Sequence, residues 1–181
     1  KAIPEVLDYF SKEIELKKET LYNCKMVQAQ DGVSVESDTL GALLYPLEGD
    51  TFALDMVIKP ERYHEFGIAL HVDKELETGY FLRMNPKNQL VAWDMWPRGE
   101  QGRYQWQIKG DVPYQIETAR KLPKAEEYRV HIIKEKDICV VYINDEIVLS
   151  TRMYNHKDGY AGIYVVQGNV KLIQYKEKRS E

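Results

Sequence analysis

The side chains best suited to binding a ligand lie on two neighbouring predicted strands, residues 79–85 and 90–96. The planar fork of an arginine and the oxygens of a carboxylate can fix hydroxyl groups, while an aromatic ring can cover the apolar face of a sugar ring. All three chemical types occur here within eighteen positions of one another, which predicts a site for a polar, ring-shaped ligand. The candidate residues are Phe81, Arg83, Asn85, Trp93, Asp94 and Trp96.

The preceding predicted strand favours a concave surface beside these residues. Gly67 and Ala69 have almost no side chain and alternate with larger apolar residues, so the outer face of the sheet is expected to be shallowly hollow. A structural interpretation stands beside this one. Trp93 and Trp96 are also suited to the core, and Arg83 is also suited to a structural ion pair with an acidic residue.

Signatures of common catalytic sites are absent from the sequence. There is no Gly-rich phosphate loop, no Gly-x-Ser-x-Gly elbow, no His-Glu-x-x-His and no paired Cys-x-x-Cys. A glycanase would need two carboxylates about 5 to 9 Å apart across the scissile bond. Glu135 and Asp137 have a suitable spacing, but they lie in a predicted turn with two lysines, where charges are normally solvated. We therefore predict no catalytic residue.

An acidic loop offers the best candidate for a metal site. Asp73, Glu75 and Glu77 could supply oxygen ligands to Ca²⁺, which prefers several hard oxygen donors. The alternative is a solvent-facing run of charges. No other cofactor is predicted, since the four histidines show no ligand spacing.

Length and charge narrow the class of protein. The 181 residues suit one domain, residues 1–181, and 25 basic against 29 acidic side chains give a net charge of −4. Nucleic-acid-binding surfaces normally carry a basic excess, so no nucleic-acid partner is predicted. No apolar run approaches the roughly 18 to 20 residues that cross a bilayer, so no membrane partner is predicted either.

Alternating apolar residues separated by turn residues predict an all-β protein. A meander of antiparallel strands must cover its apolar face with a second sheet, so we expect a two-sheet antiparallel β-sandwich over residues 25–175. Lys59-Pro60 and Gln167-Gly168-Asn169 are predicted to end strands. The predicted strands are 26–29, 33–36, 40–45, 51–58, 66–72, 79–85, 90–96, 114–118, 128–133, 138–143, 146–152, 160–166 and 170–175.

Two segments depart from the strand pattern. Residues 4–10 begin with a proline and place Val6, Leu7 and Phe10 at helical spacing, which predicts a short helix within a helical arm over residues 1–20. Residues 97–124 are rich in glycine and proline and lose periodicity, which predicts a long surface loop.

The last third of the chain resembles a known module. Residues 140–154, Val-Val-Tyr-Ile-Asn-Asp-Glu-Ile-Val-Leu-Ser-Thr-Arg-Met-Tyr, and 159–165, Gly-Tyr-Ala-Gly-Ile-Tyr-Val, resemble the C-terminal β-sandwich of the invertase, levanase and inulinase family, glycoside hydrolase family 32. The chain also resembles the related fructan-binding modules with a concanavalin-like jelly roll. The likeness covers roughly residues 50–175.

This resemblance implies a non-catalytic module. In that family the chemistry belongs to a separate five-bladed propeller, whose Asn-Asp-Pro and Arg-Asp-Pro motifs are missing here. In the fructan-binding modules an acidic residue, an arginine and an aspartate hold a terminal fructose. The matching positions in this chain are Glu36, Arg83 and Asp158. The long 97–124 segment and the predicted N-terminal helix depart from the family pattern.

Three hypotheses follow. The first is an accessory sandwich of a fructan- or sucrose-cleaving enzyme, which binds an oligo- or polysaccharide such as a fructan or braces the catalytic propeller. The second is a purely structural domain that packs on a partner domain. The third is a small β-sandwich glycanase.

Overall fold

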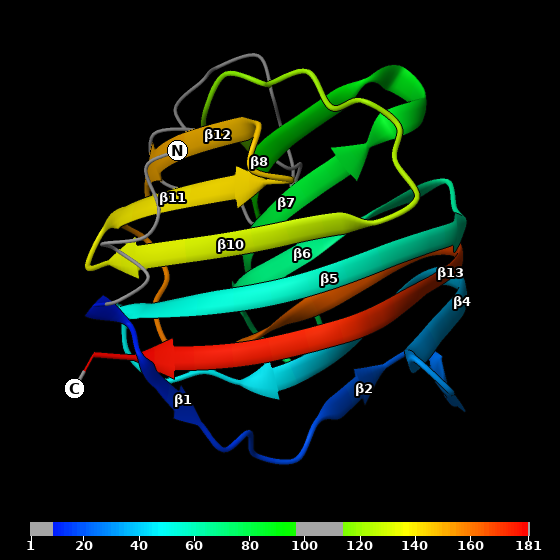
Figure 1. The fold of residues 1–181 in the computed structure, drawn as a ribbon, viewed down its shortest axis with the longest axis horizontal. Coiled ribbons are helices and arrows are strands. Elements are labelled where there is room, and N and C mark those ends of the chain that lie inside the picture. The colour runs from blue at the N-terminus through cyan, green and yellow to red at the C-terminus, as the bar shows by residue number, and fades with distance from the viewer. Residues whose placement is uncertain (1–8, 97–113, 181) are drawn as a thin grey trace.

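The protein is all-β in the part of the chain that the structure, a computed structural model, describes: residues 9–96 and 114–180 (Figure 1). Every strand pairing in this part is antiparallel. A single short 3₁₀ turn, η1 (Pro86–Asn88), joins two described strands. The strands are β1 (Lys12–Ile14), β2 (Thr20–Tyr22), β3 (Lys25–Ala29), β4 (Gly32–Pro46), β5 (Phe52–Arg62), β6 (Glu65–Val72), β7 (Gly79–Asn85), β8 (Leu90–Trp96), β9 (Tyr114–Gln115), β10 (Tyr128–Glu135), β11 (Ile138–Ile143), β12 (Ile147–Arg152) and β13 (Tyr160–Arg179).

The strands form two layers that share β13. One layer runs β12-β11-β10-β5 and continues into the C-terminal part of β13, whereas β6, β7, β8 and β9 follow from its N-terminal part. β4 pairs with β13 along most of its length. Figure 1 shows the first layer in front and the second behind it. The predicted β-sandwich is thereby confirmed.

The core lies between the layers and follows the predicted alternation. Phe52, Leu54, Met56 and Ile58 of β5 point inward and are at most 1% exposed. They pack with apolar residues of β6 to β8 and of β10 and β11 in one continuous cluster. Full burial of each such side chain stabilises the fold by about 1.5 to 3 kcal/mol, before the cost of ordering the chain is counted.

Three predicted breaks between strands are wrong. β5 continues through Pro60, and β4 and β13 each replace two predicted strands. In β13 the register shifts between Val166 and Gly168, with Gln167 at φ 51°, so the turn residues form a bulge instead of a reversal. These long strands have partners on both sides, and the paired ladders carry them through residues that alone favour a turn.

The N-terminal segment is extended from β1 onward. The predicted helix 4–10 lies mostly outside the described residues, but the helical arm 1–20 is wrong for its remainder. β1 pairs with the end of β13, Lys12 opposite Arg179, and β2 pairs with β4. The edges of β13 and β4 supplied backbone partners for these residues, whereas a helix this short is marginal without packing partners.

The predicted 97–124 loop is described only from residue 114 onward. There, β9 pairs with β8, and an isolated bridge joins Arg120 to Val91. Leu122 enters the core, fully buried. This end of the predicted loop is therefore tied to the sandwich by backbone pairing and by a buried side chain.

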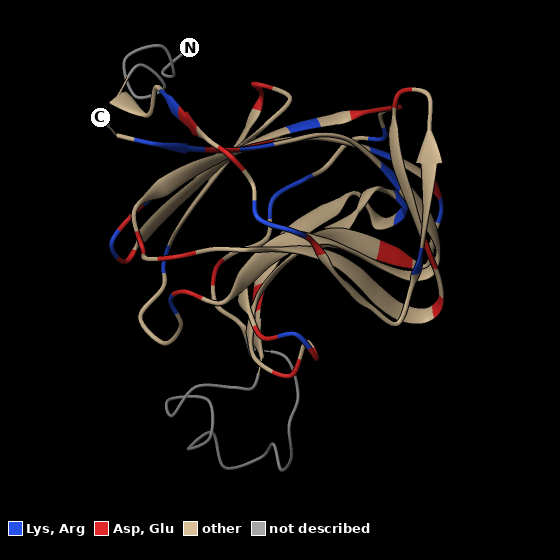
Figure 2. Cartoon of the chain, turned by 90° about the horizontal axis from the view of Figure 1, so that it is seen from below, with Lys and Arg blue, Asp and Glu red and all other residues tan. Residues whose placement is uncertain are grey.

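Charged residues of both signs are interspersed along turns and strand ends (Figure 2). This distribution agrees with the small net charge of −4. Within residues 9–96 and 114–180 the structure contains no helix with the length and apolar character needed to cross a membrane.

Candidate functional site

The outer face of the second layer carries two rows of side chains that cross neighbouring strands. The register places Tyr164 of β13 beside Gly67 of β6, Gly67 beside Arg83 of β7, and Arg83 beside Ala92 of β8. In the next row Ala69, Phe81 and Asp94 are neighbours. Large and small residues therefore alternate across this face.

The expected hollow at Gly67 is filled by the ring of Tyr164. A Cβ atom on Gly67 would lie 2.8 Å from Cε1 of Tyr164 and 1.9 Å from the carbonyl oxygen of Leu82. Tyr164 is 2% exposed and meets Phe81 edge to face, with ring centroids 5.5 Å apart. The missing side chain at Gly67 thus leaves room for the ring of Tyr164.

Arg83 and Asp94 form a two-point ion pair on this face. Arg83 Nε donates to Asp94 Oδ2 at 2.8 Å, and its NH2 group donates to Asp94 Oδ1 at 3.3 Å. The same NH2 group also donates to Gln115 Oε1 at 3.4 Å. The hydrogen bond with Asp94 raises the pKa of Arg83. The guanidinium is thus held in a fixed orientation by β8 and β9.

Glu65 completes the polar part of the face. The hydroxyl of Tyr164 donates to Glu65 Oε2 at 3.2 Å. Burial raises the pKa of Glu65, outweighing the opposing effects of that hydrogen bond and of the Arg83 charge. Asp94 adds to the rise by repulsion. The negative charge of Asp94 therefore acts on Glu65 across the face.

A groove of ≈ 400 Å³ opens beside these residues. Most of its surface is apolar, and its lining includes both aromatic rings and carboxylates. Its size and its mixture of rings with a few fixed polar groups suit a small ligand of about one or two sugar rings. The lining residues are Tyr22, Leu40, Glu65, Glu75, Leu76, Glu77, Phe81, Asp94, Trp96, Tyr164 and Val166.

The acidic loop that was considered for Ca²⁺ forms one wall of this groove. Asp73 accepts hydrogen bonds from the backbone of Glu75 and from the backbone and hydroxyl of Thr78, so its carboxylate fixes the loop. Glu75 and Glu77 face the groove, and Leu76 is buried. Among the residues that the structure describes, no group of three or more His, Cys, Asp or Glu side chains is arranged to hold a metal ion.

Trp93 does not belong to this face. It is fully buried in the main core, because the alternation of β8 turns it inward while Asp94 and Trp96 face the groove side. Its Nε1 atom is buried without a hydrogen-bond partner in the described structure. The interpretation of Trp93 as a core residue is therefore correct, and its assignment to the site is wrong.

Glu36 and Asp158 lie apart from Arg83. Glu36 is exposed, pairs in register with Asn169 and lies 3.7 Å from Arg62. The carboxylate of Asp158 accepts a hydrogen bond from the backbone of Gly49 at 2.6 Å. Tyr164 lies in the same row as Arg83, and Asp158 precedes Tyr164 by six positions, or about 20 Å of extended strand. The three residues matched to the fructan-binding modules are thus not brought together.

Sequence reasoning missed Glu65 and Tyr164. Glu65 directly precedes the predicted strand 66–72 and has the same parity as Gly67 and Ala69, so alternation already placed it on the outer face. No comparable sequence signal placed Tyr164 over Gly67, because that contact depends on the pairing of β6 with β13, about a hundred residues away in the sequence.

Comparison with known proteins shows which solved structures share the fold of this chain and does not assign it to a family. No protein-family model matches the chain, and no curated protein is similar to it in sequence. Carbohydrate-binding module CBM66 from Bacillus subtilis has a similar structure, with a TM-score of 0.74 and 16% identity, covering 91% of this chain and 97% of the module.

Two further structures share the fold. The exoplasmic/lumenal domain of VIP36, bound to Ca²⁺ and Man3GlcNAc, matches with a TM-score of 0.60 and 10% identity over 90% of this chain and 84% of that domain. A sialidase matches with a TM-score of 0.58 and 7% identity, covering 88% of this chain but 16% of the sialidase. At these identities the likeness establishes a shared β-sandwich and nothing finer.

Proposed function

We propose that this chain is a non-catalytic carbohydrate-binding module that holds one or two sugar rings in the groove beside Tyr164. The observation that carries this proposal is the composition of the groove. Aromatic side chains, Phe81 and Trp96 among them, lie next to the carboxylates of Glu65 and Asp94 in a space of ≈ 400 Å³. The rings would cover the apolar face of a sugar, and the carboxylates would accept hydrogen bonds from its hydroxyl groups.

Arg83 acts through Asp94 in this proposal. Its guanidinium already donates two hydrogen bonds to that carboxylate, which fixes the direction in which the remaining lone pairs of Asp94 point. Each hydrogen bond to a sugar replaces one to water, so the net gain is about 1 kcal/mol. A shallow groove with few such bonds should bind with a dissociation constant of roughly micromolar to millimolar.

The proposed ligand class rests on the sequence resemblance of residues 140–154 and 159–165, and not on the three matched residues, which lie apart. We propose terminal fructosides of a fructan or sucrose-like saccharide, and a parent enzyme whose catalytic domain is separate. Two observations support a module within a larger carbohydrate-active protein. The chain shares its fold with CBM66, and its match to the sialidase covers 16% of that longer protein. Bracing of a catalytic propeller by the same face is the alternative within this hypothesis.

Calorimetric titration with levan, inulin, sucrose and a panel of neutral glucans tests the proposal. We expect saturable binding to at least one fructoside and an affinity at least tenfold lower in Trp96→Ala. Tyr154→Ala is the matched control, because Tyr154 is 69% exposed and lies outside the groove. Absence of binding to every glycan would favour the purely structural domain, and unchanged affinity in Trp96→Ala would overturn the groove assignment.

A small glycanase remains the second candidate because of Glu65. Burial raises its pKa, as a general acid requires, and a second carboxylate, Asp94, lies in the same groove. A reducing-sugar assay on the purified chain with the same glycans decides between binding and hydrolysis. We expect no turnover. Release of reducing sugar by the wild type but not by Glu65→Gln would replace the binding module with a hydrolase.

A further inference from the structure

A lysine occupies a core position at the end of β10. Tyr128, Val130 and Ile132 point inward along this strand, and Lys134 follows them at the next inward-facing position. It is 1% exposed, yet it makes no hydrogen bond or ion pair with any described residue. The nearest recorded partner of its amino group is the ring of Phe52, with the centroid 6.0 Å away. This distance from the amino group to the ring is at the outer limit of a cation–π contact.

Placing an amino group here is costly unless something pairs with it. Burial lowers the pKa of Lys134, although Asp50 and Asp137 oppose the change from a distance. An apolar residue at the same position would have extended the core without that cost. The side chain is therefore hard to explain by packing alone, and an acceptor from outside the chain would remove the penalty.

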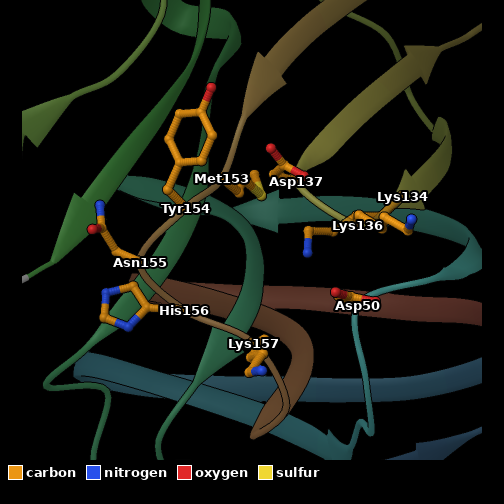
Figure 3. Close-up of a pocket in the computed structure, with 9 residues that line it drawn as sticks. All are labelled: Asp50, Lys134, Lys136, Asp137, Met153, Tyr154, Asn155, His156 and Lys157. Carbon is orange, nitrogen blue, oxygen red and sulfur yellow. The ribbon is translucent and has the colours of Figure 1, made fainter.

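A separate pocket of ≈ 290 Å³ provides room for such an acceptor. It lies between the β10–β11 turn and the segment that joins β12 to β13. Figure 3 shows residues 154–157 along one side, with Lys134, Lys136 and Asp50 on the other. The pocket shares no lining residue with the groove beside Tyr164. Its lining residues are Asp50, Lys134, Lys136, Asp137, Met153, Tyr154, Asn155, His156 and Lys157.

The charge of this pocket favours an anion. Three lysines face two aspartates, and Asp137 already lies 3.8 Å from the guanidinium of Arg152. Asp50 accepts a hydrogen bond from the hydroxyl of Thr51. Lysines 136 and 157 take part in no ion pair within the described residues. Three lysines and two aspartates therefore line the pocket, and one of the two carboxylates, Asp137, already faces Arg152.

We propose that this pocket binds an oxyanion, a carboxylate, sulfate or phosphate group, with Lys134 as the buried anchor and Lys136 and Lys157 as the outer contacts. The volume limits the ligand to a small ion or about one acidic sugar ring. Lys134 is 1% exposed and lines the pocket, so an ion pair formed there is screened less by water than one formed at the open surface. The proposal is independent of the groove and of its neutral saccharide ligand.

Titration with sodium sulfate, sodium phosphate and sodium glucuronate, at constant ionic strength set with sodium chloride, tests the pocket. Backbone amide shifts of residues 134–137 and 153–157 report binding, and glucose is the uncharged control. We expect saturable shifts with at least one anion and none with glucose. Tighter binding of glucuronate than of the inorganic ions would assign an acidic sugar, and the reverse order would assign a free oxyanion.

Variants distinguish a specific role of Lys134 from a general electrostatic attraction of anions to the protein. Lys134→Met keeps the apolar stem and should weaken anion binding at least tenfold, while Lys124→Gln removes an exposed lysine elsewhere and should change it less than twofold. Lys157→Gln provides a second test should Lys134→Met fail to fold. Trp96→Ala should leave anion affinity unchanged. Equal affinity in Lys134→Met and wild type, or no saturable shift with any of the three anions, would overturn the proposal.

Discussion

His71 Nδ1 donates a hydrogen bond of 2.8 Å to the carbonyl oxygen of Asp158, which fixes the ring proton on Nδ1 because a carbonyl can only accept. The other ring nitrogen, Nε2, is buried without a partner in the described structure. Protonation at low pH would place an N–H group there with nothing to accept it. Burial accordingly lowers the pKa of His71 from 6.5 to about 4, despite the Asp158 hydrogen bond.

This arrangement predicts that acid destabilises the fold through His71. In the unfolded chain His71 binds a proton below pH 6.5, whereas the folded chain resists until about pH 4. Stability from this residue is therefore complete above pH 6.5 and falls by about 3 kcal/mol as the pH drops to 4. Urea unfolding of wild type and of His71→Asn between these pH values measures it. Asparagine suits the left-handed backbone at φ 54°.

The stability advantage of the wild type over His71→Asn should shrink by that amount on acidification. Carboxylates that titrate in the same range are common to both proteins, so their contribution cancels in the difference. A difference that stays constant from pH 6.5 to pH 4 would show that His71 takes up its proton equally well in the folded and unfolded chains.

Gly67→Ala should destabilise the sandwich by about 2 to 3 kcal/mol. The added Cβ would meet the carbonyl oxygen of Leu82 at 1.9 Å, so β6 and β7 would have to separate locally. Thermal unfolding measures the loss. The double variant Gly67→Ala/Tyr164→Leu tests the cause, because it removes the ring but leaves the backbone contact. Full rescue by that double variant would mean that the ring, and not the neighbouring strand, excludes a side chain at position 67.

Arg83 and Asp94 should show energetic coupling in a double-mutant cycle. Their side chains are 24% and 13% exposed, so truncation of either leaves its partner partly desolvated and poorly paired. We expect each single alanine variant to lose about 2 kcal/mol of unfolding free energy, and the double variant to lose clearly less than the sum of the two.

The Lys17–Glu48 pair is the matched control for this cycle. Its atoms are 2.9 Å apart, close to the 2.8 Å of Arg83 Nε and Asp94 Oδ2, but its side chains are 68% and 79% exposed. Water and salt screen such a pair, so no measurable coupling is expected there. Similar coupling in both cycles would contradict the role assigned to burial.

The local sequence pattern predicted the fold well for strands whose bounds depend on their own residues. β7, β8 and β11 have the predicted bounds, since alternation and turn residues at their ends agree with the tertiary pairing. Prediction failed where pairing overrode local chemistry. The bulge at Gln167 and the continuation of β5 through Pro60 both depend on strands that are distant in sequence.

The candidate site was likewise predictable from the sequence only in part. Arg83, Asp94 and Trp96 share a face because they alternate on two consecutive strands, and alternation is visible in a sequence. Their neighbour Tyr164 arrives from β13, so only the three-dimensional pairing reveals it. Val72 lies in the same cluster as Ala69 and Tyr164, although strict alternation from Leu70 would place it on the opposite face. His71 is an extra residue in the ladder with β13, and its left-handed backbone reverses the alternation after Leu70.

Because β13 belongs to both layers, neither ladder is complete before that strand exists. During synthesis, β4, β5 and β6 leave the ribosome more than eighty residues ahead of the segment that joins them. The nascent chain must meanwhile keep several open strand edges from pairing with other chains. The two layers can then close only late in folding, when strands far apart in the sequence meet in one cooperative step. Such long-range pairing favours slow folding and leaves time for chaperones to bind the incomplete chain.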